Sequence, residues 1–556
     1  MTRDKTVTEA QRGLIRVGSN YARLLTTLAF GIAIVPLLTR WLGADALGLF
    51  LFLLTQSGLA AIFHEVIRTS LVREMAAAWH GEREFSEACD AAVLICLGVV
   101  VLAVGAFAIL IAILPFLGIS DEFQDAAKWM LVFECGFTVV NVLCSPAISM
   151  FVVREKFILK NILESVMRST FLIALVVAWA IWPDASPADG LIAFAGIAAG
   201  LRIVFISCPA IWMTILDRRL LGIPLRAKRD AVRAIMETFG WNTGTIIATN
   251  LHDRSGAFII NIWFGLFGST VLGMATRLVS YIRMVTMGMT FGIDAVSARL
   301  ASRSDGGQSL KRMLHSVSRM HAIMAWPATV TAFVLADELL RLWIGSSLNE
   351  KLESPEEAER YLGIMTMLVR VAALGLAARA ISDGWMFLLY GAGYISKYGK
   401  ILLGGGLIDP ILAIALIMLL PAVGDGDSAW SNIAGPSWAI TATFVAFHGI
   451  WLPIRGAKIL KVPVSDFLMP ILWPFILAVV LSPVLIWPDW IPLFREPGEA
   501  WGLLDLGLGM TTFAVVYVLC IWVLLLSGEE RERVVRSVRR LRGSRPDDGG
   551  GSGDRR

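Results

Sequence analysis

The feature that most constrains the fold is a series of apolar runs, each about 20 residues or longer, that recur along the whole chain. Charged residues make up only 17% of the sequence, whereas soluble domains usually carry about 25%. Backbone polar groups in lipid must be bonded within the protein, so continuous apolar runs must be helices. The runs do not alternate, which argues against barrel strands. The sequence therefore predicts an all-α polytopic membrane bundle.

The hydropathy pattern predicts about 14 transmembrane helices. Their expected ranges are 18–41, 46–67, 89–115, 126–151, 158–182, 188–215, 239–264, 268–298, 320–345, 362–390, 398–420, 430–454, 466–487 and 501–526. The first run is longer than the ~7–15 apolar residues of a signal peptide. We therefore expect it to be retained as a helix.

Basic and acidic residues separate between the predicted loops. Most of the 49 Lys and Arg residues lie in the N-terminus, the even-numbered loops and the tail. The odd-numbered loops are acidic, as in "SDEFQD" (120–125) and "NEKLESPEEAER" (349–360). The positive-inside rule then places both termini in the cytoplasm. The net charge of +4 is explained by this asymmetry, so we expect membrane lipids, and no nucleic acid, as partners.

A weak internal repeat predicts two pseudo-symmetric lobes. The segments 18–43 and 240–265 share G-x-N at the start, one threonine and W-x-G at the end, with equal spacing. Chance similarity is the alternative. A parallel repeat of this kind is typical of transporters, which place a substrate site between lobes. The predicted parts are a cytoplasmic N-terminus (1–17), an N-lobe of six helices (18–215), a basic cytoplasmic linker (216–235), a C-lobe of six helices (236–455), two further helices (456–527) and a basic, partly disordered cytoplasmic tail (528–556).

Motifs for covalent or metal chemistry are missing from the sequence. The six cysteines show no CxxC spacing and are expected to pack within the bundle. No HExxH, GxSxG or Walker motif occurs. The longest outer loop, 346–361, is short and acidic. We therefore expect a non-enzyme with no catalytic residue, no metal and no cofactor.

Charged residues inside the predicted spans indicate where a cargo could pass. A charge at the bilayer centre costs roughly 2.5–3.5 kcal/mol on insertion scales, so it rarely faces lipid. The stretch "TNLHDRSGAFII" (249–260) places His252, Asp253 and Arg254 in the middle of the seventh span. At 100° per residue, Asn250 and Arg254 share one face with Thr243 and Asn261. Asn242 and Thr249 join Asp253 on the adjacent face, and His252 lies opposite.

Some of these charges are expected to pair within the protein. Glu164 with Arg168, and Arg379 with Asp383, have the i,i+4 spacing of a helix-surface ion pair. The remaining deep charges favour arginine, which binds pyrophosphate oxygens bidentately and keeps its proton in a partly dry cavity. The predicted substrate cavity is lined by Asn20, Arg23, Asn250, Arg254, Arg277, Arg283 and Arg370. Candidates for ion coupling are Glu134, Asp253 and Asp294.

Three stretches make the chain resemble the Wzx-type polysaccharide or O-antigen flippases of the multidrug/oligosaccharidyl-lipid/polysaccharide exporter superfamily. They are "PLLTRWLGADALGLFLFL" (36–53), "SPAISMFVVREKFILKNILESVMRS" (145–169) and "DELLRLWIG" (337–345). The resemblance extends to about residue 460. It implies a bacterial inner-membrane protein that moves undecaprenyl-pyrophosphate-linked oligosaccharide to the outer leaflet for polysaccharide or lipopolysaccharide biosynthesis. The implied partners are the lipid-linked oligosaccharide, membrane lipids and other polysaccharide-assembly proteins.

Two other transport functions stay open at this point. A lipid-linked peptidoglycan precursor also carries a pyrophosphate, so an arginine-lined cavity suits its flippase equally well. A multidrug exporter of the same superfamily would move cationic drugs and would favour acidic cavity residues. The excess of deep arginines argues against that second alternative.

Overall fold

The structure is a computed structural model. It describes residues 9–53, 67, 71–72, 74–76, 78–79, 81–154, 156–290, 293–301, 306–352, 354–422, 430–490, 502–526, 528, 531–532 and 535. Within these residues the secondary structure is entirely helical, which confirms the predicted all-α bundle. Eleven of the described helices are long and apolar enough to cross a membrane, or twelve if one bent pair counts as a span.

The chain up to residue 226 contributes long helices joined by short turns. They are α1 (Glu9–Leu42), a helix over Ala44–Leu53, α3 (Glu82–Ile113), η1 (Leu114–Phe116), α4 (Asp121–Val153), α5 (Phe157–Ile181), α6 (Pro187–Leu216), η2 (Arg218–Leu221) and η3 (Pro224–Arg226). The predicted second span, 46–67, lies partly outside the described residues. Ser186 caps α6 by accepting a hydrogen bond from the backbone N–H of Asp189, and a proline follows at the first helical position.

The remainder of the chain continues the same pattern. Its elements are α7 (Arg229–Thr290), α8 (Ile293–Ala301), α9 (Gly306–Val334), α10 (Ala336–Leu340), η4 (Arg341–Gly345), α11 (Ser346–Lys351), α12 (Pro355–Gly391), α13 (Ile395–Leu419), η5 (Asn432–Ala434), α14 (Gly435–Thr443), η6 (Phe444–Trp451), α15 (Leu452–Leu460), α16 (Ser465–Val480), η7 (Ser482–Trp490), α17 (Leu503–Cys520) and η8 (Ile521–Leu525). Helix α7 is broken at Gly265, where φ is 59°. Its apolar part, 243–290, contains 48 residues, about twice what one bilayer crossing needs. The break therefore separates the predicted seventh and eighth spans.

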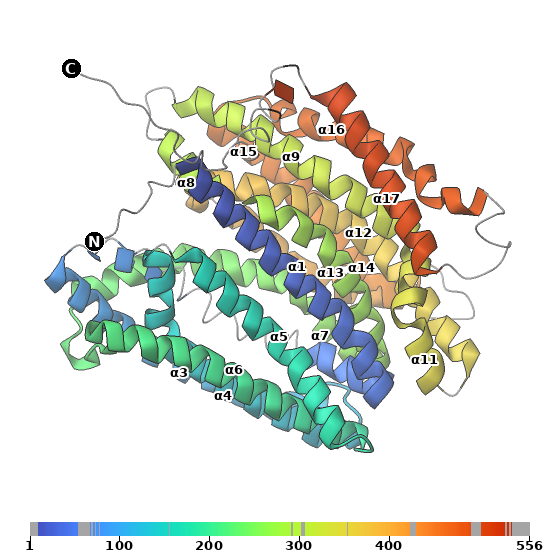
Figure 1. The fold of residues 1–556 in the computed structure, drawn as a ribbon, viewed down its shortest axis with the longest axis horizontal. Coiled ribbons are helices and arrows are strands. Elements are labelled where there is room, and N and C mark those ends of the chain that lie inside the picture. The colour runs from blue at the N-terminus through green and yellow to red at the C-terminus, as the bar shows by residue number, and fades with distance from the viewer. Residues whose placement is uncertain are drawn as a thin grey trace, which may run out of the picture.

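The helices form two packed groups. Helices α3 to α6 pack on one another in the lower left of Figure 1, and α7 packs with α9, α12 and α13. We call these groups the first lobe (9–216) and the second lobe (229–460). Helix α1 contacts both, because it packs on α5 and also on α7. Helices α16 and α17 pack against α9 at the outside of the second lobe.

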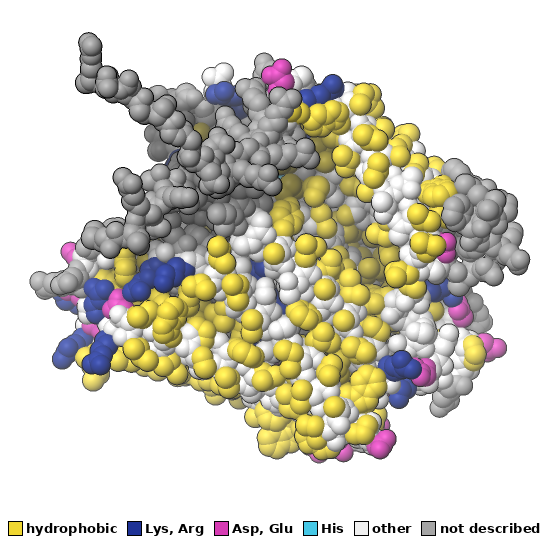
Figure 2. All heavy atoms as spheres, viewed as in Figure 1, with side chains coloured by type: hydrophobic (Ala, Val, Ile, Leu, Met, Phe, Trp, Pro, Cys, Tyr) yellow, Lys and Arg dark blue, Asp and Glu magenta, His cyan; other side chains and the backbone are white. Residues whose placement is uncertain are grey.

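The surface has the distribution expected of a membrane protein. Figure 2 shows hydrophobic side chains over most of the visible described surface, while charged side chains gather toward its edges. Helix α3 alone exposes Leu97, Val101, Leu102 and Ile109. Exposing so many apolar side chains to water would cost free energy, whereas contact with lipid acyl chains removes that cost. The chain is therefore a multi-pass membrane protein.

The lobes meet at the end that carries the odd-numbered loops. Trp343 donates to the backbone oxygen of Ile32 at 2.7 Å, and Thr270 donates to that of Ala44 at 2.9 Å. Asn261 donates to the backbone oxygen of Leu117. These bonds join the two lobes at their predicted outer ends. The two lobes are therefore linked at that end by hydrogen bonds.

A charge cluster fixes the opposite end of the first lobe. Asp217, directly after α6, accepts from Arg219 at 2.8 and 2.9 Å and from Arg154 at 3.3 Å. Arg154 belongs to the basic turn 145–169 and also lies over the Trp79 ring. The hydrogen bonds from Arg219 hold the pKa of Asp217 below its ordinary value, although burial opposes the shift.

We expect the first lobe to lose stability in acid through this aspartate. The lowered pKa means that Asp217 stabilises the fold fully above its unfolded pKa of about 3.9 and loses that contribution as the pH falls through the lower folded value. Asp217→Asn should cost about 1.5 kcal/mol at neutral pH and should unfold with a weaker acid dependence than the parent. Thermal unfolding against pH measures both. Asp184→Asn, at an exposed outer turn, is the control and should match the parent.

Candidate functional site

Arg277 lies between the lobes. It belongs to the second half of α7 and packs against α1 at Gly31, where an added Cβ would lie 3.1 Å from its Nη2 and 3.1 Å from the Tyr281 hydroxyl. Glycine at position 31 is therefore what lets the guanidinium approach the α1 backbone. Among the described residues no acid forms an ion pair with Arg277, and its Nε is buried without a hydrogen-bond partner. A half-buried arginine without an acidic partner still has N–H groups that can donate hydrogen bonds to a ligand.

Arg168 lies within electrostatic range of Arg277 and belongs to the first lobe. It lies on α5, and its side chain is exposed although the helix is packed between α1 and α6. Arg168 interacts electrostatically with Glu164, Arg202, Arg277 and Arg23. It forms no ion pair with any residue that the structure describes. We call Arg23, Arg168 and Arg277 the interlobe arginines, because they come from α1, α5 and α7, and Arg23 and Arg277 each lie within electrostatic range of Arg168.

The predicted pairing of Glu164 with Arg168 is wrong. Glu164 instead binds Arg23 of α1 and Lys160, the latter at 3.2 Å. The i,i+4 spacing permits the pair with Arg168, but α1 packs against this face of α5 and supplies a competing guanidinium. Because the i,i+4 spacing assigns Arg168 to Glu164, the predicted cavity does not include Arg168. The only sign of a role for Arg168 in the sequence is that the basic residues near it outnumber the acidic ones by one.

The other predicted cavity residues lie on separate elements. Arg254 donates from Nε to the Asn250 amide oxygen at 2.7 Å, so these two share a face of α7 as expected. The same face carries Phe258, whose ring packs on Phe52 of the first lobe. Arg370 is exposed on α12 and donates to the backbone oxygen of Phe333 at 3.2 Å. The side chain of Asn20 lies outside the described residues.

Arg283 belongs to a buried network in the second lobe. It binds Asp383 through two nitrogens at 2.6 and 3.3 Å and approaches Asp253 at 3.5 Å. Asp383 also lies 3.6 Å from Arg379, which confirms that predicted i,i+4 pair. Arg379 in turn contacts the His448 ring at 3.2 Å. The network is nearly neutral by composition, so Arg283 has less positive charge to offer an anion than Arg168 or Arg277.

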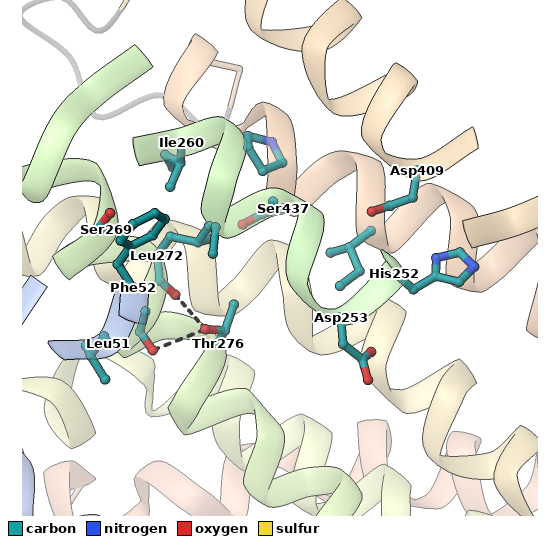
Figure 3. Close-up of a pocket in the computed structure, with 15 residues that line it drawn as sticks. Leu51, Phe52, His252, Asp253, Ile260, Ser269, Leu272, Thr276, Asp409 and Ser437 are labelled. Carbon is teal, nitrogen blue, oxygen red and sulfur yellow. Dashed lines mark hydrogen bonds between the residues drawn. The ribbon is translucent and has the colours of Figure 1, made fainter. Parts of the chain in front are cut away.

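The three adjacent residues His252, Asp253 and Arg254 have separate surroundings. His252 is buried against Phe444 and His448. Asp253 leaves the same turn of α7 in another direction (Figure 3). Its carboxylate lies 3.5 Å from Arg283. Arg254 bonds to Asn250. The helical periodicity predicts His252 on the opposite side of α7 from Arg254, and these contacts agree with that prediction.

A small cavity lies beside Asp253 and Asp409. It has a volume of about 50 Å³ and is lined by His252, Asp253, Thr276, Asp409 and Ser437 among others (Figure 3). Asp409 of α13 is 2% exposed and accepts from Ser255 at 3.0 Å and from Thr443 at 2.8 Å. No described basic residue forms an ion pair with Asp409. A buried carboxyl with two hydroxyl donors can exist protonated or beside a cation.

The other coupling candidates differ in their partners. Glu134 of α4 binds Arg202 of α6 through two bonds of 2.6 and 3.1 Å. The Arg202 guanidinium stacks on Phe137, 3.6 Å from the ring centroid, so this pair is held rigidly. Asp294 is half-buried on α8, where α12 approaches closely enough that a Cβ on Gly391 would collide with the Asp294 backbone. The roles of these carboxylates in ion coupling stay predictions.

Filling the space at Gly31 tests the placement of Arg277. Gly31→Leu must displace the Arg277 guanidinium, because the first added carbon would already lie 3.1 Å from it. We expect transport to fall at least as far as it does for removal of the guanidinium, with the protein still folded. Gly98→Leu on α3 is the matched control, since a Cβ there meets nothing within 4 Å. Equal transport by the two variants would contradict the placement.

Comparisons with known proteins identify the fold. No protein-family model matches the chain, and no curated protein matches its sequence. Among solved structures, a lipid II flippase, MurJ, in an inward closed conformation has a TM-score of 0.64 and 15% identity, with 92% of this chain and 99% of that chain covered. A MATE protein in complex with MaL6 gives 0.53 and 13%, covering 80% and 96%. An inward-facing multidrug resistance MATE family transporter of the MOP superfamily gives 0.50 and 16%, covering 81% and 98%. The chain therefore has the helical fold shared by these MOP-superfamily transporters.

Proposed function

We propose that this protein is a flippase for lipid-linked oligosaccharides that carry a pyrophosphate, most specifically undecaprenyl-pyrophosphate-linked oligosaccharide. The observation that carries the proposal is the pair of arginines, Arg168 of α5 and Arg277 of α7, that lie within electrostatic range of each other without an acidic ion-pair partner among the described residues. Guanidinium groups bind phosphate oxygens bidentately and retain their charge away from water. The fold shared with a lipid II flippase supports transport as the activity.

The geometry suggests how such a cargo would be handled. The interlobe arginines would hold the pyrophosphate, while the polyprenyl chain stays in the surrounding lipid. Arg254, Asn250 and Arg370 would extend the polar path within the second lobe. Because the lobes are bonded together at the predicted outer end, release there requires those bonds to break. Alternating access by rocking of the lobes would satisfy this requirement.

Coupling to an ion gradient is assigned to the second lobe in this proposal. Asp253 lies at the small cavity beside Asp409 and also contacts Arg283. Protonation or cation binding at these carboxylates would change the charge balance around Arg283 and Asp383. Glu134 is the less suitable candidate, because its carboxylate is already neutralised by Arg202. Asp294 lies on α8, away from this cavity lining.

A lipid-linked peptidoglycan precursor is the second candidate cargo. It is favoured by one observation, the high coverage of the MurJ fold, at 92% of this chain and 99% of that one. The interlobe arginines would bind its pyrophosphate equally well. The two candidates differ in the sugar part of the headgroup. Only a direct comparison of substrates separates them.

The test is a transport assay with three cargoes in proteoliposomes. Fluorescent undecaprenyl-pyrophosphate oligosaccharide, a labelled peptidoglycan precursor lipid and a cationic dye are compared, with an impermeant quencher reporting the leaflet. We expect quenching that depends on the protein for the oligosaccharide lipid and none for the dye. Faster movement of the precursor lipid would select the second candidate. Movement of the dye alone would reject both and favour a drug exporter.

A further inference from the structure

The linker between the lobes, residues 217–229, has an unusual composition. It reads "DRRLLGIPLRAKR", with five basic residues and one acid, and the apolar run 220–225 lies between two groups of basic residues. The segment forms η2 (Arg218–Leu221) and η3 (Pro224–Arg226) between the end of α6 and the start of α7. It lies at the lower left of Figure 1, at the edge of the first lobe. The linker therefore occupies the margin of the bundle at the predicted cytoplasmic end.

The linker is held in a fixed orientation on α3. Leu220 is buried, and the backbone N–H of Ile223 donates to the Asp90 carboxylate at 2.6 Å. Gly222 has φ of 49° and passes so close to α3 that a Cβ would lie 2.7 Å from the Cys89 backbone oxygen. A residue with a side chain would be strained at this position on both counts. The orientation of the side chains on either side of Gly222 is therefore fixed by the backbone contact with α3.

This orientation turns three apolar side chains outward. Leu221 is 65% exposed, Ile223 is 44% exposed and Leu225 is 98% exposed. They continue the exposed apolar surface of α6, which ends in Ile215 and Leu216. Exposure of leucine side chains to water is unfavourable in free energy, so these side chains are more stable in an apolar environment. Their position beside the end of a membrane helix places them at the boundary between headgroups and acyl chains.

Basic side chains accompany this apolar edge. Arg219 forms an ion pair with Asp217, and Lys228 forms one with Glu87. Arg218, Arg226 and Arg229 are exposed, and none of the described acids forms an ion pair with them. At the lower left edge of Figure 2, Lys and Arg side chains lie beside hydrophobic ones, with some acidic side chains among them. An apolar edge flanked by free guanidinium groups matches the chemistry of an anionic lipid, which offers acyl chains and a phosphate.

We propose that the linker is an interfacial anchor that binds anionic lipid headgroups of the adjoining leaflet. Leu221, Ile223 and Leu225 enter the acyl boundary, while Arg218, Arg226 and Arg229 bind lipid phosphates. Hydrogen bonding to Asp90 transmits this attachment to α3. Since the same segment joins the two lobes, it fixes the first lobe at the membrane surface while the second lobe moves.

The first test measures lipid binding. Arg218→Gln, Arg226→Gln and Arg229→Gln are combined, and retention of phosphatidylglycerol over phosphatidylcholine is measured by native mass spectrometry of the full chain. We expect phosphatidylglycerol binding to fall at least about 10-fold, because each basic residue near an anionic surface contributes a severalfold gain. The control combines Arg455→Gln, Lys458→Gln and Lys461→Gln, which remove the same charge from α15 and the residue that follows it. Equal lipid binding by the two triple variants would overturn the proposal.

The second test measures depth and does not depend on charge. A spin label is placed at Leu225→Cys after the exposed Cys208 is replaced by serine, and its collisions with oxygen and with a water-soluble nickel chelate are compared in phosphatidylglycerol vesicles. The label should favour oxygen, whereas a label at the exposed outer turn, Asp184→Cys, should favour the chelate. Preference for the chelate at residue 225 would overturn the proposal. Shielding from both reagents would overturn it in favour of a protein partner. Neither test measures transport, so both are independent of the proposed function.

Discussion

Replacing Arg277 with alanine should abolish transport and leave the protein folded. Arg277 has no acidic partner among the described residues, and it lies within electrostatic range of Arg168. Removing one of two like charges relieves repulsion, so the thermal stability should stay level or rise. A charge-assisted hydrogen bond contributes about 1.5–3 kcal/mol, so binding of the pyrophosphate should weaken roughly 10–100-fold. A substitution that raises stability but removes activity is typical of a residue whose role is functional rather than structural.

Three further variants complete this prediction. Arg277→Lys keeps the charge but loses the planar fork, so transport should be intermediate. Arg168→Ala should reproduce the Arg277→Ala result from the opposite lobe. Arg455→Ala, at an exposed position on α15, should transport normally. Flipping in proteoliposomes and thermal unfolding are measured on the same preparations. Full transport by Arg277→Ala would remove the main support for pyrophosphate binding between the lobes.

The largest loss of stability is expected from Asp383→Asn. Asp383 is fully buried and neutralises both Arg283, at 2.6 Å, and Arg379, at 3.6 Å. The substitution would leave two guanidinium groups close together without their shared counterion. Breaking one side of a buried ion pair costs about 3–5 kcal/mol. We expect a protein that expresses poorly or loses its structure well below the unfolding temperature of the parent.

Asp253→Asn is the matched control for that result. It removes the same charge from the same network, but Asp253 is exposed and lies 3.5 Å from Arg283. Arg283 would still bind Asp383 through two bonds. The control should therefore unfold within about 1 kcal/mol of the parent. Because many membrane proteins unfold irreversibly, half-lives at a fixed temperature are the better measure. Similar half-lives for the two variants would contradict the assigned role of Asp383.

The sequence determined the fold class because hydropathy acts on long stretches. Apolar runs of sufficient length leave the backbone no choice but helix in lipid, so most expected spans have a helix in the structure. The break at Gly265 was anticipated as the boundary between the seventh and eighth spans, although both halves fall in one continuous element. Local spacing also predicted some of the contacts within single helices. The pair Arg379–Asp383 and the shared face of Asn250 and Arg254 are examples.

Contacts between helices were decided only by the tertiary structure. Glu164 has Arg168 one turn away, yet it binds Arg23 from a helix that lies 141 positions earlier. Arg283 is a predicted cavity residue, and only the structure shows that Asp383, 100 positions away, binds it. The physical reason is that an ion pair forms only between side chains that lie within a few ångströms of each other in the packed protein. A periodic pattern shows which residues share a face, but the partner on the next helix depends on how the helices pack, and that decides which arginines are left with charge to offer a ligand.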